Sequence, residues 1–248
     1  MFIPPNDKPY RRFIKRLHKN LAFEWYLEIG CRGGRIFEAA QGKTIAVDPY
    51  FRIERNVVNT KPELHIMQQT SDAFFDGGFL RAIRAQLSFS FLDGMHLIEY
   101  LLRDFINTER HSNPDGVIAI HDCCPYNHDM TTRDLDNAPA EAWTGDVWKI
   151  IPILQAYRPD LKLTVLGCEP TGLLLVSNLN PRSRKLSSNY DKIIQDWASV
   201  TLLDYGTERF FAAFDYTRAH QIEKDGYTLF DRVRLDDGAV RDPHYVSP

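Results

Sequence analysis

The chain has 248 residues, of which 44% are hydrophobic and 25% are charged, and its formal net charge at pH 7 is -3. This composition is typical of a folded globular protein and excludes an intrinsically disordered chain. The nearly balanced charge is not the basic signature of nucleic-acid-binding proteins, so we expect no nucleic-acid partner. The sequence has no run of eighteen apolar residues, so we expect neither a membrane-spanning helix nor a membrane partner.

The N-terminal residues MFIPPNDKPYRRF place prolines and charges where a signal peptide has a continuous apolar stretch, so we expect a cytoplasmic protein. The basic residues that follow alternate with Phe13, Ile14 and Leu17, which predicts an amphipathic surface helix rather than a membrane or RNA contact. No CxxC spacing is present, so we expect free thiols rather than a disulfide framework or structural zinc at Cys31, Cys123, Cys124 and Cys168.

Short apolar runs alternate with longer helical patterns in the first half of the chain, which is typical of βαβ units and a largely parallel sheet. Strands are predicted at residues 23–30, 43–48, 63–68, 88–93 and 117–122. Helices are predicted between them at residues 35–42, 71–87 and 96–109, with Ser71 as the N-cap of the second.

The segment from Cys123 to about Thr144 has few apolar residues, and a loop of this length in a compact domain is usually a lid or a binding segment. A helix is predicted at residues 145–159, where Pro152 either kinks the helix or marks its first turn. Two further strands follow, and the six residues GCEPTG between them are too few for a helix, so we expect these strands to pair antiparallel.

The composition changes after Pro181, where two helical patterns occupy residues 187–206 and 207–226 and a hairpin is predicted around Asp236-Asp237-Gly238. We therefore expect three parts: an N-terminal helix at 1–22, a Rossmann-like α/β domain at 23–181, and a helical C-terminal extension at 182–248.

A glycine-rich turn in the segment YLEIGCRGGRIF suggests a ligand-binding site. Glu28 lies near the end of the first strand, Gly30 starts the turn, and Gly33-Gly34 open the predicted helix. Glycines let a ligand approach the backbone closely, and helix N-terminal amides face its anionic group. Asp48 ends the next strand, where a carboxylate commonly binds a ribose. A glycine-rich turn without a ligand is the structural alternative.

Both nucleotide cofactors and S-adenosylmethionine contain a ribose, so two enzyme classes fit this turn. Residue 32 is arginine where the dehydrogenase fingerprint G-x-G-x-x-G has a glycine. An antiparallel hairpin at the end of the sheet also differs from the usual dinucleotide-binding fold. Both details favour a methyltransferase. A nucleotide-dependent oxidoreductase and a non-catalytic binding or assembly protein of the same fold remain as alternatives.

These motifs resemble those of the class I S-adenosylmethionine-dependent methyltransferases. LEIGCRGG is similar to their first motif, AVDP to their second, and TGLLLVSN to the last strand of their seven-stranded sheet. FLDGMH followed by NPDGVIAIHD resembles a subgroup of small-molecule O-methyltransferases, similar to those that act on macrolide sugars, which carry an acidic-Gly-x-His motif after the fourth strand. The resemblance covers about residues 23 to 180. It implies a seven-stranded Rossmann-like methyltransferase sheet that ends in an antiparallel hairpin.

The resemblance also implies the roles of individual residues. S-adenosylmethionine would be bound by Glu28, Gly30, Arg32, Gly33, Gly34, Asp48, Ser71, Asp72 and Asp93. Asp93 and Asp122 would bind magnesium, and His96 would act as general base. This chain has His121 where those relatives have glutamate, which leaves the third metal ligand open between His121 and another group.

The same residues point to one site without the resemblance. The predicted strand ends are Glu28, Asp48, Asp93 and His121-Asp122, and open parallel sheets bind ligands outside the carboxyl ends of their strands. A histidine can accept the proton of an alcohol, and a divalent cation held by carboxylates acidifies a bound hydroxyl. Together with the resemblance, this site implies methyl transfer to a hydroxyl of a small molecule, for which a sugar is one candidate.

The same residues could also have simpler, structural roles. Asp93 could cap the following helix, and His96 could be an ordinary residue at the start of that helix. The sequence HDCC at residues 121–124 does not predict zinc, because four adjacent residues cannot all face one ion. Trp143 and Trp148 are predicted to pack rather than to bind a ligand. The sequence sets neither the acceptor nor the methylated atom, and it leaves open a homo-oligomer formed through residues 182–248.

Overall fold

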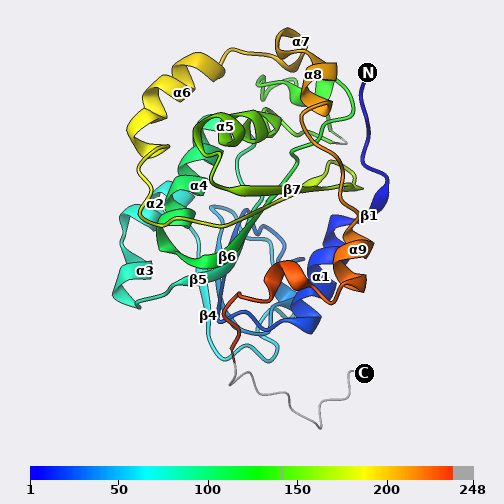
Figure 1. Cartoon of the computed structure of the whole chain (residues 1–248). Coiled ribbons are helices and arrows are strands. Elements are labelled where there is room, and N and C mark those ends of the chain that lie inside the picture. The colour runs from blue at the N-terminus through cyan, green and yellow to red at the C-terminus, as the bar shows by residue number, and fades with distance from the viewer. Residues whose placement is uncertain (141, 237–248) are drawn as a thin grey trace.

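The computed structural model describes residues 1–140 and 142–236. Its centre is a seven-stranded sheet in the order β4-β3-β2-β5-β6-β9-β7, with a separate pair of short strands, β1 and β8 (Figure 1). The strands of the large sheet are β2 (Trp25–Ile29), β3 (Lys43–Val47), β4 (Leu64–Met67), β5 (Leu87–Leu92), β6 (Ser112–His121), β7 (Lys162–Leu166) and β9 (Leu173–Ser177).

The pairing of these strands confirms the predicted fold class. Strands β4, β3, β2, β5 and β6 are mutually parallel, and β9 runs antiparallel to both β6 and β7. Every residue of β2 and β5 is buried, as is typical of central parallel strands covered on both faces. The sheet is therefore the α/β, Rossmann-like sheet with an antiparallel hairpin at one edge that the sequence predicts.

Helices cover both faces of the sheet. They are α1 (Tyr10–Asn20), α2 (Ser71–Asp76), α3 (Phe79–Ala82), α4 (Ile98–His111), α5 (Ile150–Tyr157), α6 (Tyr190–Trp197), α7 (Leu202–Tyr205), α8 (Thr207–Phe211) and α9 (Ala219–Lys224). Short 3-10 turns are η1 (Phe37–Ala39), η2 (Asp129–Thr131), η3 (Val147–Lys149), η4 (Ser187–Asn189) and η5 (Thr228–Phe230).

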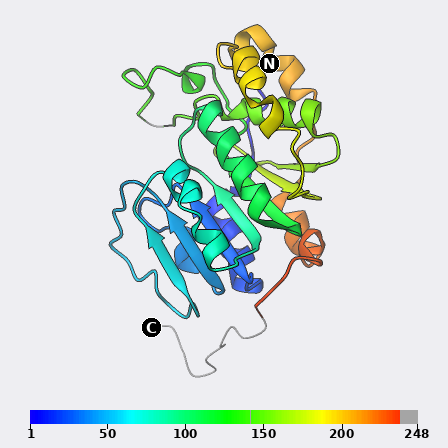
Figure 2. The same ribbon diagram turned by 90° about the vertical axis from the view of Figure 1, so that its left-hand side faces the viewer.

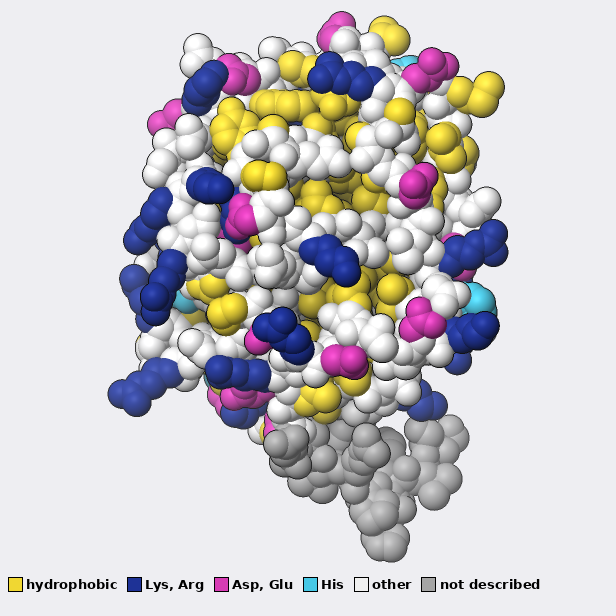
Figure 3. Space-filling model, viewed as in Figure 1, with side chains coloured by type: hydrophobic (Ala, Val, Ile, Leu, Met, Phe, Trp, Pro, Cys, Tyr) yellow, Lys and Arg dark blue, Asp and Glu magenta, His cyan; other side chains and the backbone are white. Residues whose placement is uncertain are grey.

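Two hydrophobic cores result from the alternation of side chains along the strands. Leu27 and Ile29 of β2 face one core, which includes residues of α4, α5 and α6, whereas Tyr26 faces a second core under α1 and α9. Figure 2 shows the two helical layers on opposite sides of the sheet. On the face seen in Figure 3, hydrophobic side chains gather over the upper and central part, with some charged side chains among them and more along the sides.

The N-terminal segment contains a strand that the sequence did not predict. Residues Asp7–Pro9 form the unpredicted strand β1, which pairs in parallel with β8 (Cys168–Glu169) in the hairpin connection. The amphipathic pattern of α1 is confirmed, because its apolar residues Phe13, Ile14 and Leu17 are fully buried. This pairing and packing place the start of α1 beside the carboxyl end of β6.

The helices predicted at 187–206 and 207–226 are shorter than expected. They are broken into α6, α7, α8 and α9. Thr201 starts α7 with a reciprocal capping box to Asp204, which ends the earlier helical run. Gly206, with φ of +96°, separates α7 from α8. Of the hairpin predicted at 236–238, residues 237 and 238 lie outside the described residues.

Two predicted helices in the first half are wrong in extent. Residues 35–42 form only the turn η1, because Arg32 and Gly34 have positive φ and fold the chain into successive turns. The helix predicted at 71–87 breaks into α2 and α3 at Gly78, whose φ is +67°. The N-cap of α2 is Thr70, whose hydroxyl accepts a hydrogen bond from the Ala73 amide, rather than Ser71.

Several other predictions agree with the structure. Pro152 lies in the first turn of α5, where its missing amide proton costs no hydrogen bond. All four cysteines are free and buried. Among the described residues, no helix has the length and apolarity needed to cross a bilayer, and the longest, α4, has 14 residues.

Candidate functional site

Two neighbouring parallel strands bring acidic and histidine side chains to one edge of the sheet. Leu92 of β5 pairs with Ile120 of β6, so the residues that follow these positions leave the sheet side by side. Asp93 follows β5, whereas His121 ends β6 and Asp122 follows it. This is the carboxyl edge of the parallel strands, where ligands of open α/β sheets bind.

Three of these side chains form a compact group. Asp93, His96 and Asp122 each offer one ligand atom, and these atoms lie within 4.8 Å of one another. His96 Nε2 is 3.2 Å from Asp122 Oδ2 and 3.7 Å from Asp93 Oδ1. Two carboxylates with one imidazole are a donor set suited to a divalent cation. We call Asp93, His96 and Asp122 the rim cluster.

The orientation of His96 is fixed by a residue of the long loop. His96 Nδ1 is 2.7 Å from the carbonyl oxygen of Trp143. A carbonyl only accepts hydrogen bonds, so Nδ1 carries a proton and Nε2 is the nitrogen that faces the carboxylates. Burial lowers the pKa of His96, but the hydrogen bond to Asp93 and the charge of Asp122 outweigh it and raise the pKa above its usual value.

His121 contacts both carboxylates of the rim cluster. Its Nδ1 is 3.1 Å from Asp93 Oδ1 and 3.2 Å from Asp122 Oδ2, and its Nε2 is 3.2 Å from the Thr171 hydroxyl. That hydroxyl donates to Asp122, so it accepts from His121 Nε2. Burial opposes a charge on His121, but Asp122 and Asp93 raise its pKa to about 10. Both ring nitrogens therefore donate, and His121 acts as a cation between the carboxylates.

Two residues near the rim cluster could not be found from the sequence pattern. Tyr10, from the start of α1, stacks on His121 with 3.6 Å between ring centroids. Burial raises the pKa of the Tyr10 hydroxyl, and so does the charge of Asp93. Thr171 comes from the connection between β8 and β9. Both are brought in by tertiary contacts alone, and no local motif marks either of them.

Asp93 does not cap α4. The helix begins after Leu97, and the amide of Ile98 instead donates to Asp146 Oδ1 at 2.6 Å. Asp146 is buried and also accepts from the buried Lys149 at 2.8 Å. The helix start is therefore satisfied by the segment before α5, which leaves the Asp93 carboxylate directed at the two histidines.

The predicted cofactor residue Glu28 lies inside the protein. Its side chain is 2% exposed and accepts a hydrogen bond of 2.6 Å from the Tyr26 hydroxyl. Burial raises the pKa of Glu28 to about 8. Gly30 has φ of +87°, and a Cβ there would lie 1.9 Å from the carbonyl oxygen of Asp93. The close approach that requires this glycine is thus one between the two strand ends.

Asp48 fastens the glycine-rich turn to the segment that follows it. Asp48 Oδ2 accepts from the amide of Arg32 at 2.8 Å, and Oδ1 accepts from the amide of Tyr50 at 2.6 Å. Residues 49–61, which we call the covering segment, then run over the turn. A Cβ on Gly34, whose φ is +71°, would lie 2.8 Å from Val57 of this segment, whereas one on Gly33 would meet only ordinary contacts.

Ser71 and Asp72 lie at the start of α2 and are not part of the rim cluster. The Asp72 carboxylate makes a bidentate ion pair with Arg103 at 2.8 and 2.7 Å. Ser71 acts on the buried Asp104 and lowers its pKa, but burial outweighs this effect and raises that pKa to about 7. The structure therefore brings together Asp93, His96, His121 and Asp122, and leaves Ser71 and Asp72 engaged with α4.

The residues present fit a divalent cation well and the methyl donor in part. Two carboxylate oxygens and one imidazole nitrogen of the rim cluster lie within 4.8 Å of one another. Each Asp48 oxygen accepts one backbone hydrogen bond, which leaves each a second acceptor site for a ribose hydroxyl. The fit of the methyl donor is partial because Val57 of the covering segment packs against Gly34 of the glycine-rich turn.

Comparison with known proteins gives structural likenesses only. No family model and no curated protein matches the chain. An O-methyltransferase from Bacillus cereus in complex with SAH is 14% identical with a TM-score of 0.47, over 69% of this chain and 82% of that one. The O-methyltransferase TomG from Streptomyces achromogenes, involved in tomaymycin synthesis and in complex with SAM, is 17% identical with a TM-score of 0.46, over 69% and 80%.

A third similar structure holds magnesium. The MycE methyltransferase from the mycinamycin biosynthetic pathway, in complex with Mg and SAH, is 15% identical with a TM-score of 0.45, over 70% of this chain and 49% of that one. The chain thus spans about half of MycE. At these identities and TM-scores the likeness is one of architecture alone, and the chain is similar in overall structure to these methyltransferases.

Proposed function

We propose that the protein is a methyltransferase that transfers a methyl group from S-adenosylmethionine to a hydroxyl of a small molecule, with a magnesium ion bound at the rim cluster. The observation that carries the proposal is the convergence of Asp93, His96 and Asp122 within 4.8 Å at the carboxyl edge of the parallel strands. Acidic groups at this edge are placed to act on a ligand bound across the sheet.

The two carboxylates would hold the cation. Asp122 is positioned by the Thr171 hydroxyl, and Asp93 is positioned by His121 Nδ1. Such second contacts orient ligands and commonly change metal affinity by roughly 10–100-fold. A bound divalent cation supplies Lewis acidity that lowers the pKa of a coordinated hydroxyl. His121 would stay protonated and offset part of the negative charge of the carboxylates.

His96 would remove the proton from the acceptor hydroxyl. Its Nδ1 is held by the Trp143 carbonyl, so the proton would be accepted at Nε2. Coordination of the cation through Nε2 would exclude this role, because one nitrogen cannot do both. The two roles are separated by His96→Gln: a base predicts lost turnover with magnesium affinity unchanged, whereas a ligand predicts that both are lost.

A second candidate is a non-catalytic protein of the same architecture. The observation that favours it is the close packing of Val57, from the covering segment, on Gly34 of the glycine-rich turn. Such a protein would bind metal or a partner without binding the methyl donor. Self-association through residues 182–248, and the division of the chain at residues 22 and 181, are likewise proposals.

Calorimetric titration tests the proposed function. The purified chain is titrated with S-adenosylhomocysteine, with a nicotinamide dinucleotide and with magnesium, followed by a turnover screen against a hydroxyl library. Binding of S-adenosylhomocysteine with magnesium-dependent methyl transfer is the expected result. Binding of the dinucleotide alone would favour an oxidoreductase, and binding of neither would favour the second candidate. Asp231→Asn, at an exposed position, is the matched control for Asp93→Asn and Asp122→Asn.

A further inference from the structure

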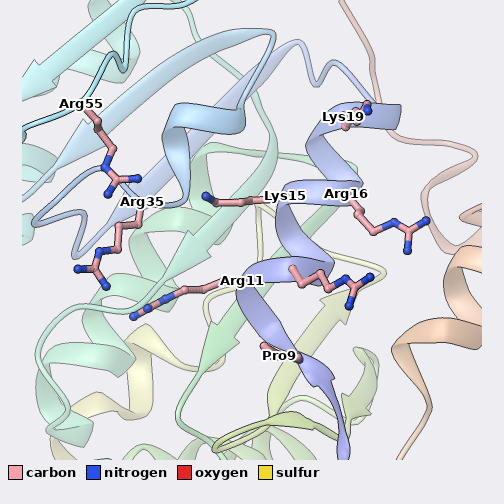
Figure 4. Close-up of a pocket in the computed structure, with 8 residues that line it drawn as sticks. Pro9, Arg11, Lys15, Arg16, Lys19, Arg35 and Arg55 are labelled. Carbon is pink, nitrogen blue, oxygen red and sulfur yellow. The ribbon is translucent and has the colours of Figure 1, made fainter. Parts of the chain in front are cut away.

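A strongly basic groove of about 630 Å³ lies along the outer side of α1. Seven of its eight lining residues are arginine or lysine, although the whole chain carries a formal net charge of -3. In Figure 4, Arg11 and Lys15 point from α1 toward Arg35 and Arg55, whereas Arg16 points to the other side of the helix. We call Arg11, Lys15, Arg35 and Arg55 the basic groove.

The charge of the basic groove is only partly balanced within the chain. Lys15 and Arg55 both pair with Glu38, the latter at 2.7 Å. Within the described residues, neither Arg11 nor Arg35 makes an ion pair with a carboxylate, and both side chains are exposed. Four cations thus face one carboxylate. An excess of this size on one part of the surface attracts multiply charged anions.

The basic groove adjoins the rim cluster. Arg11 Nε donates to the Tyr10 hydroxyl at 3.1 Å, and the Tyr10 ring stacks on His121, which contacts Asp93 and Asp122. Arg35 follows the glycine-rich turn directly, and Arg55 belongs to the covering segment. The basic groove and the rim cluster are therefore neighbours, separated by the buried ring of Tyr10.

We propose that the basic groove binds the diphosphate of a small-molecule acceptor, such as a nucleoside diphosphate carrying a sugar. The groove as a binding site stands on its own, whereas the identification of its ligand as the acceptor rests on the proposed function. Arginine forks match phosphate oxygens in bidentate geometry, and a diphosphate offers enough charge to meet four cations.

Other occupants fit less well. The methyl donor is a sulfonium cation, so a groove of four cations repels it. A membrane contact would need apolar side chains beside the charges, but Phe13, Ile14 and Leu17 of α1 are buried in the core. A nucleic acid would need a longer basic track than α1, which is 11 residues or about 16 Å long.

The test is a calorimetric titration of the full chain without divalent cations, using inorganic pyrophosphate, uridine diphosphate and a uridine diphosphate sugar, with uridine as the uncharged control. The wild-type protein should bind the three diphosphates and should not bind uridine. Its affinity for the diphosphates should fall as the salt concentration rises. Arg35→Gln and Arg11→Gln should each weaken binding by about tenfold or more. Arg182→Gln, at an exposed arginine outside the basic groove, should leave binding unchanged.

The outcomes separate this inference from the proposed function. Absence of pyrophosphate binding, or equal binding by wild type and Arg35→Gln, overturns the diphosphate site. Binding of RNA or of anionic vesicles without binding of pyrophosphate also overturns it, in favour of a macromolecular polyanion. S-adenosylhomocysteine is titrated in parallel. Diphosphate binding without S-adenosylhomocysteine binding would support the diphosphate site and contradict the proposed methyltransferase function. Methyl transfer to neutral acceptors alone would support the methyltransferase function and contradict the diphosphate site.

Discussion

The ring of Tyr10 lies on the ring of His121 with 3.6 Å between centroids and 28° between planes. An aromatic face over an imidazolium gives a favourable cation–π contact, strongest where water is excluded. His121 in turn holds Asp93 and Asp122 together. The first turn of α1 therefore supports the carboxylates at the carboxyl edge of the sheet.

Tyr10 allows this support to be tested. Tyr10→Phe keeps the stacked ring and removes only the hydrogen bond from Arg11, so the free energy of unfolding should fall by about 1 kcal/mol or less. Tyr10→Ala removes a buried ring and should cost about 3–5 kcal/mol. Urea denaturation measures both. Equal destabilisation by the two variants would show that the hydroxyl, and not the ring, supports the cluster.

Thr171 should act on metal binding without touching the metal. Thr171→Val keeps the shape of the side chain and removes the hydroxyl that joins Asp122 to His121. We expect magnesium affinity to fall by roughly 10–100-fold while the chain stays folded. Calorimetry with magnesium checks this, and Thr164→Val in β7 makes the same change outside the cluster. Unchanged affinity in Thr171→Val would mean that Asp122 needs no such support.

Gly30 should be intolerant of any side chain. A Cβ there would lie 1.9 Å from the Asp93 carbonyl oxygen, and its φ of +87° is already unfavourable for other residues. Gly30→Ala should therefore prevent folding or yield insoluble protein. Gly226 also has a positive φ, but a Cβ added there would meet no atom within 4 Å, so Gly226→Ala should cost only about 1 kcal/mol. Soluble yield and thermal unfolding compare the two, and a stable Gly30→Ala protein would disprove the close packing.

His18 should make stability depend on pH. It is 1% exposed between Phe23, Tyr26 and Phe89, and burial, assisted by the charge of Lys61, lowers its pKa to about 3. The unfolded chain binds this proton near pH 6.5, so the stabilising contribution is present above that pH and is lost as pH falls toward 3.

The slope from this group approaches about 1.4 kcal/mol per pH unit. His18→Phe removes the titrating group and should flatten that part of the curve of unfolding free energy against pH. Denaturation midpoints between pH 4 and 7 measure the difference. Parallel curves for wild type and His18→Phe would assign the acid sensitivity to other groups.

The sheet and the carboxylates at its edge could be predicted from the sequence, because both depend on local patterns. Apolar runs define the parallel strands, and the carboxyl ends of neighbouring parallel strands meet, so the proximity of Asp93 and Asp122 could be predicted. Tyr10 and Thr171 could not, since they reach His121 from distant parts of the chain. The contact of β1 with β8 that places Tyr10 is equally non-local.

The glycine-rich turn shows why a motif alone misleads about local structure. The pattern after Gly33-Gly34 suits a helix, but the positive φ of Arg32 and Gly34 turns the chain before a helix forms. Gly30 was expected to admit a ligand, and the group that approaches it is the Asp93 carbonyl. Helix breaks at Gly78 and Gly206 also depend on backbone conformations that periodicity does not encode.

The most direct test of the central claim is a Mn²⁺ titration followed by electron paramagnetic resonance, with Mn²⁺ standing in for magnesium. We predict one bound ion for wild type and for the control Asp231→Asn, and affinity lower by at least about tenfold in Asp93→Asn and in Asp122→Asn. Equal Mn²⁺ binding by wild type and both cluster variants would contradict the assignment of the rim cluster as a metal site.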